Sequence, residues 1–546
     1  MYRLNQSNKP FFRKISFEHI LVCCFLLYIF FFTIVPIFGK HFDRIPGDLI
    51  DARFNNYLLE NGYSYLTQKD HIFWNAPFCY PEKNIISFSD NFIGQLPVYT
   101  LFRIGGLDNQ SAYQGWMVVT FLLNFCICAW VLYKLSGSRI GALVGAFIFS
   151  FALPLFDQNY HSQMLARYAI PLAFYHLIRF LKNGRHLNFL YLLLSVVLQF
   201  YLSIYLGLLL SLALFCGLTG YLIFYRRDVR FSELFAKRKL RWLALHALLA
   251  GALLFVFMRP YVERSKQPIV PMKETVMASL PEPSAYLLTS WNATSWRDLT
   301  HVPDGMKDFW NKFLFPGGVA AAAVLAFLVM LIINGYRLIL RMPESGLKLG
   351  MVFLAGFLLI FILTTRFHEF TVYQLVYRIP GFKAMRDLCR VVNVELFFYA
   401  GMAALLVSLL LARIRNPWLR NMFATLLLIG VVVDNLYDPV NAVTYSKEGS
   451  RKQFMELVAK IKAHPDYRSY EAMVYMPAES KDYAGAVQID AMLAAQYLKI
   501  KTVNAYTATC PAHFCEFAVH SNVENLKIWL NSKGLAVDST RFLFIR

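Results

Sequence analysis

Two aspartates stand three residues apart just after the first long apolar run of the chain, in the stretch GDLIDARFNNYLLENG. If this stretch is helical, Asp48 and Asp51 share one helical face, where a carboxylate can take the proton of a hydroxyl group. A third acid, Asp90, lies in the aromatic, proline-containing segment 73–99, which is typical of a loop lining a cavity at a membrane interface. The alternative is structural: Asp48 caps a helix, and Asp51 pairs with Arg53 or with an arginine of another loop.

Four cations gather in a second segment, far along the chain. The stretch YRIPGFKAMRDLCR contains Arg378, Lys383, Arg386 and Arg390. Arg386 and Arg390 are four residues apart, so in a helix they are neighbours, and the planar fork of arginine fits phosphate oxygens. The sequence therefore predicts a phosphate site here. The alternative is a set of cations that meets lipid headgroups or pairs with Asp387 and Glu369.

Other polar residues give less specific signals. His161 and Gln163 in YHSQ are candidates to contact an acceptor or a lipid phosphate, although a lone histidine at a helix start usually makes a structural hydrogen bond. The segment CPAHFC holds Cys510 and Cys515, which could form a disulfide or stay as thiols. Its spacing fits no common zinc pattern and no second ligand pair follows, so we expect no metal ion.

The composition places these residues in a membrane protein. Of 546 residues, 57% are hydrophobic and only 16% are charged, which leaves too few charges to cover the apolar surface in water. The net charge of +20 could indicate a nucleic-acid binder, but such proteins gather lysine and arginine on a soluble face beside stacking residues. Here the basic residues fall in short loops between apolar runs, so we expect membrane lipids, and no nucleic acid, as partners.

Eleven apolar runs are long enough to cross a bilayer as helices. They cover approximately residues 16–38, 114–133, 140–156, 163–181, 188–202, 204–225, 241–258, 317–336, 347–364, 391–412 and 419–436. The fifth and sixth form one block about twice the length of a single crossing, and we divide it at Ser203. The first run exceeds the apolar core of a signal peptide and lacks a small-residue cleavage site, so we expect it to remain as an anchor.

Basic residues mark every second connection between these runs. The N-terminus is basic, and so are the loops 134–139, 182–185, 226–241, 337–348 and 413–420, which predicts that all of them face the cytoplasm. The long aromatic connections then share the outer face, chiefly 39–113, 259–316 and 365–390. Loops carried on a rigid helical scaffold are a common place for an active site, so we expect the catalytic face there.

The residues after about 436 have a different character. Short segments predict a strand at 472–477 (AMVYMP), a helix at 486–500, a strand and turn at 501–508, a helix at 517–534 ended by Gly534, and a final strand in RFLFIR. We therefore expect an all-α multi-spanning membrane bundle over 1–436, followed by a soluble α/β domain over 437–546. An odd number of crossings from a cytoplasmic N-terminus places that domain outside.

The chain resembles the GT-C superfamily of integral membrane glycosyltransferases, and within it a group of bacterial proteins. The resemblance rests on GDLIDARFNNYLLE, FWNAPFCYP and FSDNFIG in the first outer loop, and on FDQNYHSQMLARYAIPLAF, KFLFPGG, IPGFKAMRDLCRVV and KTVNAYTATCP further along. It implies a bacterial inner membrane and the transfer of a sugar from a polyprenyl-phosphate carrier to a glycan, lipid or protein acceptor of the cell envelope. The lipid-linked sugar is then a substrate, and no cofactor is expected.

The resemblance also implies that an acid just after the first transmembrane helix is the catalytic carboxylate. Several members of the superfamily carry adjacent acids, whereas two residues separate Asp48 from Asp51 here. We prefer Asp51, in the better matched DARFNNY, as the base, with Asp48 assisting and Asp90 positioning a group. Analogy favours inversion at the sugar, since a single displacement needs one base.

Two other classes of function stay open. A lipid-linked glycan transporter should carry polar or broken helices at the membrane midplane, and the predicted spans hold few ionisable residues. A non-catalytic envelope assembly protein would use the C-terminal domain for docking, and it would not need Asp48, Asp51 and Asp90 together.

Overall fold

The computed structural model describes residues 17–68, 72–158, 161–229, 234, 236–266, 273–302, 306, 309–341, 345–439, 443–477 and 484–546. The basic residues expected before Phe17 therefore lie outside the described residues, as does part of the loop 226–241. The helices are α1 (Phe17–Tyr28), α2 (Asp51–Gln68), α3 (Leu96–Ile104), α4 (Asn109–Ser136), α5 (Arg139–Phe151), α6 (Leu153–Asp157), α7 (Ala169–Asn183), α8 (His186–Leu202), α9 (Ile204–Tyr225), α11 (Lys237–Arg264), α12 (Lys273–Ala278), α13 (Gly318–Arg341), α14 (Gly346–Thr364), α15 (Tyr373–Val376), α16 (Val392–Arg413), α17 (Pro417–Asp434), α18 (Lys447–Lys462), α19 (Ala484–Leu498), α20 (Cys515–Val519) and α21 (Val523–Ser532). The strands are β1 (Arg44–Pro46), β2 (Arg366–Phe367), β3 (Phe370–Thr371), β4 (Thr444–Ser446), β5 (Ala472–Tyr475) and β6 (Phe542–Ile545).

Within the described part of the chain, nine helical segments are long and apolar enough to cross a membrane, and they match nine of the eleven predicted runs. The other two runs, 163–181 and 188–202, form α7 and α8, which have only 15 and 17 residues. The run at 163 is shorter than predicted because its first residues form a 3₁₀ turn and an irregular segment before Ala169. The protein is thus a mostly helical, multi-pass membrane protein, and the count of eleven crossings stays a prediction.

The predicted break at Ser203 is confirmed. Helix α8 ends at Leu202 and α9 begins at Ile204, while Ser203 between them is extended, with φ −162° and ψ 125°. The carboxylate of Asp90, from the first outer loop, accepts hydrogen bonds from Ser203 Oγ at 2.8 Å and from the Ile204 N–H at 2.9 Å. The acid therefore caps the start of α9, where backbone N–H groups have no partner within the helix.

Two glycines bring α5 against α16. A Cβ atom on Gly141 would lie 2.4 Å from the carbonyl oxygen of Ala404, and one on Gly145 would lie 2.5 Å from that of Ala400. Small residues four apart let two helix backbones approach closely in a membrane. This contact fixes α16 relative to α5, and these two helices border the segments in which the candidate site residues lie.

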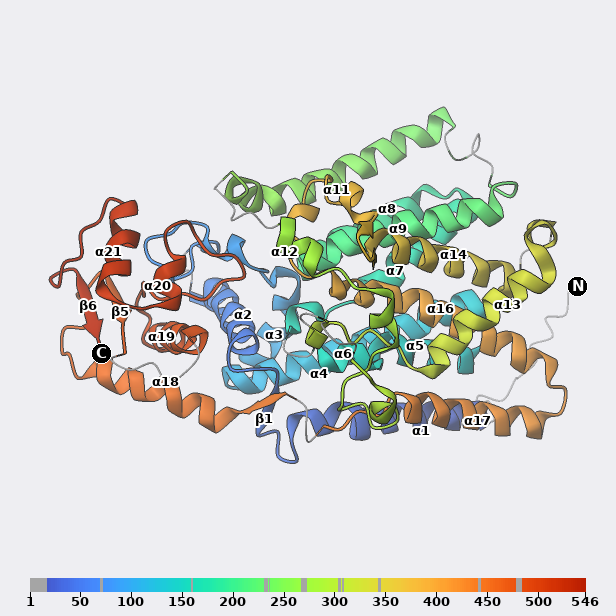
Figure 1. Cartoon of the computed structure of the whole chain (residues 1–546), viewed down its shortest axis with the longest axis horizontal. Coiled ribbons are helices and arrows are strands. Elements are labelled where there is room, and N and C mark those ends of the chain that lie inside the picture. The colour runs from blue at the N-terminus through green and yellow to red at the C-terminus, as the bar shows by residue number, and fades with distance from the viewer. Residues whose placement is uncertain are drawn as a thin grey trace, which may run out of the picture.

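The long helices run side by side, and the C-terminal elements α18 to α21 lie beside α2 at one end of them (Figure 1). Strand β4 pairs with β1 of the first outer loop in antiparallel register, and β5 pairs with β6 in parallel register. Strand β5, helix α19 and strand β6 agree with three of the predicted elements. The connection between α16 and α17 lies at the opposite end of the molecule (Figure 1).

Two of the predicted C-terminal elements are wrong. The segment 501–508 contains no strand and makes a single bridge, Thr502 to Met473. The helix predicted over 517–534 is divided into α20 and α21, because the Asn522 side chain accepts a hydrogen bond from the Asn525 N–H and starts a new helix. The division of the chain into two domains at residue 436 stays a prediction.

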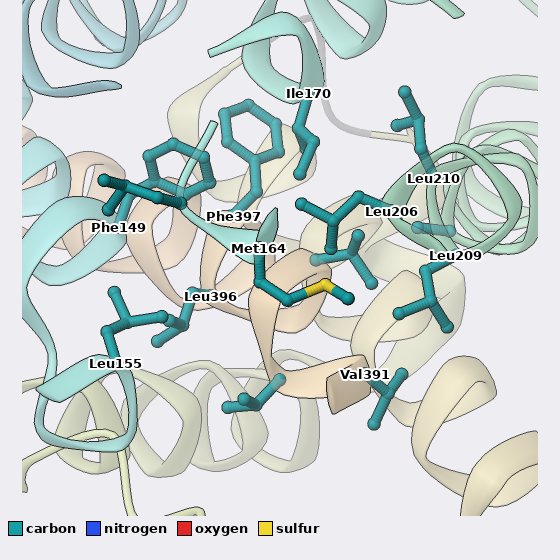
Figure 2. Close-up of a cluster of buried hydrophobic side chains, with 14 of the residues drawn as sticks. Phe149, Leu155, Met164, Ile170, Leu206, Leu209, Leu210, Val391, Leu396 and Phe397 are labelled. Carbon is teal, nitrogen blue, oxygen red and sulfur yellow. The ribbon is translucent and has the colours of Figure 1, made fainter. Parts of the chain in front are cut away.

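A buried apolar cluster includes residues that are close in sequence to His161 and Arg390. Figure 2 shows Met164 at its centre, among side chains of α5, α6, α7, α9 and α16. Met164 is three residues after His161, and Val391, at the edge of the cluster, directly follows Arg390. Close packing leaves such side chains little freedom, so the cluster holds the two polar residues in fixed positions.

Candidate active site

The two aspartates of the first outer loop do not share a helical face, so that prediction is wrong. Helix α2 begins at Asp51, and Asp48 lies before it. The Oδ1 atom of Asp48 accepts hydrogen bonds from the N–H groups of Ile50 at 3.2 Å and Ala52 at 3.1 Å. The structural alternative for Asp48 is therefore the observed one, since this side chain caps the helix that carries Asp51.

Asp51 contacts side chains from two distant parts of the chain. Its Oδ2 atom lies 2.9 Å from His161 Nδ1, and its Oδ1 atom accepts a 2.6 Å hydrogen bond from the hydroxyl group of Tyr506. The pairing with Arg53 that the sequence suggested does not occur, because Arg53 pairs with Asp490 of α19. The Asp51 side chain keeps 24% of its surface exposed, which leaves room for another molecule to reach it.

The two aspartates differ in their acidity. Burial raises the pKa of Asp51, but the contacts with His161 and Tyr506 and the charge of Arg390 outweigh it, so the net direction is downward. Burial, followed by the charge of Asp51, raises the pKa of Asp48 despite its backbone hydrogen bonds. Asp51 is therefore the stronger acid of the pair, and its carboxylate stays ionised down to a lower pH than that of Asp48.

His161 links Asp51 to Arg390. Arg390 Nη2 lies 3.1 Å from His161 Nε2, on the opposite side of the ring from Asp51. A guanidinium group can only donate, so Nε2 accepts and the proton of a neutral ring lies on Nδ1, facing Asp51. Burial and then the charge of Arg390 lower the pKa of His161, which agrees with a neutral ring.

Arg390 lies among aromatic and acidic groups of three segments. Its Nε atom is 3.4 Å from Asp387 Oδ2, and its guanidinium group is 5.0 Å from the ring centre of Tyr205 in α9. The hydroxyl group of Tyr205 donates to the carbonyl oxygen of Asp387, which holds the loop against α9. The pairing with Asp387 agrees with the structural alternative, but the additional contact with His161 joins Arg390 to Asp51.

The helical face predicted for Arg386 and Arg390 is wrong, because residues 385–387 are extended and only Leu388–Val391 form a 3₁₀ turn. Arg386 nevertheless lies near the other groups. Burial of its head group and the charge of Arg390 lower its pKa, while Tyr506, Tyr205 and Asp51 act in the opposite direction. Arg386 as a whole residue is nevertheless exposed to solvent, so a ligand can reach it.

Three predicted residues lie outside this contact chain. Arg378 and Lys383 are exposed, and no described acid lies within ion-pair distance of either. Asp90 caps α9 as described above, and burial raises its pKa to about 6, although its backbone and Ser203 hydrogen bonds and the charge of Arg390 lower it. Asp90 therefore supports the helix that carries Tyr205, and it acts on Arg390 only through charge.

Gln163 and its neighbour fix the loop of His161 to α2. The Asn55 side chain donates to Gln163 Oε1 and to Ser162 Oγ, both at 2.8 Å, and Ser162 Oγ lies 2.5 Å from the hydroxyl group of Tyr113. Asn55 is one helical turn after Asp51. The aspartate and the histidine are thus held on two segments that are bonded to each other, and Gln163 contributes through position.

A buried polar network contacts the backbone of Arg390. Arg167, 2% exposed, donates from Nη1 to Asn393 Oδ1 at 3.0 Å. The amide group of Asn393 donates in turn to Gln158 Oε1 and to the carbonyl oxygen of Arg390, both at 3.0 Å. These side chains and His161 line a cavity of about 20 Å³, which is enough for about one water molecule.

Sequence reasoning missed Tyr506, Asn55, Arg167 and Asn393. Tyr506, Arg167 and Asn55 lie inside matched motifs, and this was the available signal for them. Tyr506 and Asp51 are 455 residues apart, so only the folded chain brings them together.

The segment with Cys510 and Cys515 bears on possible metal and disulfide chemistry. Among the residues that the structure describes, no group of three or more His, Cys, Asp or Glu side chains could hold a metal ion. Cys510 and Cys515 are both thiols here, and burial and then the neighbouring Cys515 raise the pKa of Cys510.

Comparison with known proteins shows a coarse structural likeness. No model of a known protein family matches the chain, and no curated protein matches it in sequence. The archaeal oligosaccharyltransferase AglB from Archaeoglobus fulgidus, solved in complex with an inhibitory peptide and a dolichol-phosphate, is similar over 95% of this chain and 68% of its own. The identity is 12% and the TM-score is 0.49.

Proposed function

We propose that this protein is a membrane glycosyltransferase of the GT-C type, which moves a sugar from a polyprenyl-phosphate carrier to an acceptor hydroxyl group at the outer face of the membrane. The observation that carries the proposal is the contact chain Asp51–His161–Arg390. It supports the proposal because a proton acceptor and a phosphate-binding cation are separated by one imidazole ring. Transfer from a lipid phosphate needs both groups close together.

Asp51 is the base in this proposal. A carboxylate can take a proton only while it is ionised, and the surroundings lower the pKa of Asp51 and raise that of Asp48. Two titratable groups whose pKa values are driven apart commonly divide the acid and base roles of a site. Asp48 then serves the base indirectly, by capping the helix that carries it.

The proposed step is a single displacement. The acceptor oxygen forms a bond to the anomeric carbon while its proton passes to Asp51. The bond between that carbon and the phosphate oxygen breaks, and its electron pair leaves with the polyprenyl phosphate. Because there is a single displacement, the configuration at the sugar is inverted. Arg390 and the exposed Arg386 hold the added negative charge of the phosphate, so the proposed step requires no metal ion or other cofactor.

His161 and Tyr506 hold the base in place. A neutral imidazole ring, donating from Nδ1 and accepting at Nε2, fixes the distance between Asp51 and Arg390 without adding charge. The Tyr506 hydroxyl group holds the other carboxylate oxygen at 2.6 Å. Both contacts reduce the freedom of the base before a substrate arrives, which lowers the cost of reaching the reactive geometry.

The orientation is part of the proposal. Asp51 of α2 is linked to Arg390 through His161, and it accepts from Tyr506. Helix α2 and the C-terminal elements α18 to α21 lie at one end of the long helices, whereas the basic connection between α16 and α17 lies at the other end (Figure 1). By the positive-inside rule the basic end faces the cytoplasm. We therefore propose a bacterial inner membrane with the site on the outer face, where a lipid-linked donor and an envelope acceptor can meet.

The test is transfer from a polyprenyl-phosphate sugar by the purified full-length protein. Asp51→Asn keeps the shape of the side chain and removes its basicity, so turnover should fall about a hundredfold to ten-thousandfold. Asp48→Asn is the matched control, because asparagine also caps helices, and most of its turnover should remain. Full activity in Asp51→Asn, with thermal unfolding unchanged, would contradict the proposal.

The same preparations separate the other functions. A transporter would move the lipid-linked sugar between the leaflets of a vesicle with no acceptor present. It would form no glycosylated product, either as the wild type or as Asp51→Asn. Addition of a chelator should leave transfer unchanged if no divalent metal ion takes part.

A further inference from the structure

A second polar cleft lies between α2, α3 and α4 on one side and α18 and α19 on the other. Its volume is about 570 Å³. Glu60 of α2 lines it, and because a helix rises about 1.5 Å per residue, this position is roughly 14 Å along α2 from Asp51. The cleft is therefore separate from the contact chain around Asp51, although both are built on the same helix.

Positive charge prevails in this cleft. Four cations line it against two acids, which are Arg103, Arg451, Lys499 and Lys501 against Glu60 and Asp108. Glu60 is already engaged, because it accepts from both Arg103 and the hydroxyl group of Tyr99. Asp108 caps α4 by accepting from the N–H groups of Gln110 and Ser111.

The remaining three cations face the cleft with their charge available. Arg451, Lys499 and Lys501 are exposed, and no acid among the described residues lies within ion-pair distance of them. The ammonium nitrogen of Lys501 lies 5.3 Å from the ring centre of Tyr80, a cation–π distance, and its charge also acts on Glu471. Three accessible cations in one concave surface favour an anionic ligand with several charges.

Amide and hydroxyl groups fill the spaces between the cations. They include those of Asn61, Ser64, Gln68, Asn109, Gln110 and Gln496. Asn61 is 1% exposed, and its Nδ2 atom has no hydrogen-bond partner in the described structure. A buried donor without a partner costs about 1–3 kcal/mol, so its presence in the wall of a cleft indicates that a ligand or water supplies the acceptor.

The lining matches a sugar chain better than a peptide. Asparagine, glutamine and serine side chains both donate and accept, as hydroxyl groups require. Tyr497, 53% exposed, and Phe454 lie with ring centres 6.2 Å apart and offer an aromatic rim. A peptide bound in extended form usually adds to a sheet edge, and none of the residues lining this cleft lies in β1 to β6.

We propose that this cleft binds an anionic oligosaccharide, with Arg451, Lys499 and Lys501 holding its acidic groups and Asn61 holding a hydroxyl or carboxyl oxygen. The binding itself is independent of catalysis. The further step, that this oligosaccharide is the acceptor chain whose growing end reaches Asp51, rests on the proposed function.

The test is binding to the full-length protein in detergent, measured by calorimetry, in the Asp51→Asn background so that no transfer can occur. The probes are an oligogalacturonate of six residues, maltohexaose as a neutral chain of the same length, and hexaglutamate as an acidic peptide. Oligogalacturonate should bind at least tenfold more tightly than either of the others. The double variant Lys499→Glu and Lys501→Glu should weaken it at least tenfold, and raising the salt concentration should also weaken it.

Two variants separate this site from a general charge effect. Lys527→Glu, at an exposed position of α21 outside the cleft, is the matched control and should leave the affinity unchanged. Asn61→Leu removes the unpartnered donor, so it should weaken binding while thermal stability stays the same or rises. Equal binding of maltohexaose, tighter binding of hexaglutamate, or equal losses in the Lys527→Glu control would overturn the proposal, whatever the outcome of the transfer assay.

Discussion

The hydroxyl group of Tyr506 provides a quantitative test of how Asp51 is held. It donates to Asp51 Oδ1 at 2.6 Å, and this hydrogen bond is one of the causes that keep the pKa of Asp51 low. A hydrogen bond to a charged group contributes about 1.5–3 kcal/mol, and about 1.4 kcal/mol corresponds to a factor of ten in a proton equilibrium. Replacing Tyr506 with phenylalanine removes this contribution and keeps the ring.

The expected result follows from the sign of that change. Without the donor the ionised form of Asp51 is less stable, so its pKa rises and the base is lost at a higher pH. The acid limb of kcat/KM against pH should therefore move upward, with half of the maximal value reached at a proton concentration at least about tenfold lower. The assay is sugar transfer at low donor concentration over a range of pH, because kcat/KM reports the free enzyme.

A matched tyrosine provides the control. Tyr57 lies on the same helix as Asp51, is 1% exposed, and its hydroxyl group has no partner in the described structure. Tyr57→Phe should leave the acid limb unchanged and should not lower thermal stability, since it removes an unpaired polar group. An unmoved acid limb in Tyr506→Phe, or an equal movement in Tyr57→Phe, would refute the reasoning.

Three further predictions concern donor binding, stability and orientation. Arg390→Lys keeps the charge but loses the fork that reaches His161, so the donor KM should rise roughly tenfold or more, and an unchanged KM would favour the lipid-anchor interpretation. Because the pKa of Asp90 is raised to about 6, the folded state loses stability on the order of 3 kcal/mol as the pH rises from about 4 through 6. Asp90→Asn lacks that loss, so its unfolding temperature relative to that of the wild type should be higher at pH 8 than at pH 5. An equal change in unfolding temperature between the two pH values in both proteins would contradict this. Alkaline phosphatase fused after Arg546 should be active only if the C-terminal elements lie outside, and an inactive, well-expressed fusion would reverse the proposed orientation.

The membrane helices could be predicted from the sequence because apolar run length directly reflects bilayer thickness. The break at Ser203 was predictable for the same reason, since one block was too long for a single crossing. The start of α7 was not, because the residues after His161 are apolar enough to continue a helix but are held in another conformation by Asn55 and Asn124. Tertiary hydrogen bonds overrode the local preference there.

The contacts within the candidate site were harder to predict from residue spacing than the membrane helices were. Arg386 and Arg390 were paired on an assumed helix, yet they approach through an extended segment. His161 was ranked low because a lone histidine usually has a structural role, and the contacts that link it to Asp51 and Arg390 come from segments far away in the chain. Residue type and side of the membrane could be inferred from the sequence, but the pairing of partners depends on how the helices pack.

The position of Tyr506 bears on what the C-terminal elements do. If they served only to dock another protein, a tyrosine hydroxyl group 2.6 Å from Asp51 would have no purpose. The elements are also joined to α2 by the ion pair of the buried Arg53 with the partly exposed Asp490 and by the hydrogen bond from Gln496 to the Tyr57 carbonyl oxygen. A buried ion pair adds little stability over an apolar pair but is costly to break, so it favours one relative position of its two segments. The C-terminal elements therefore hold one side of the proposed base, and a docking role alone does not account for them.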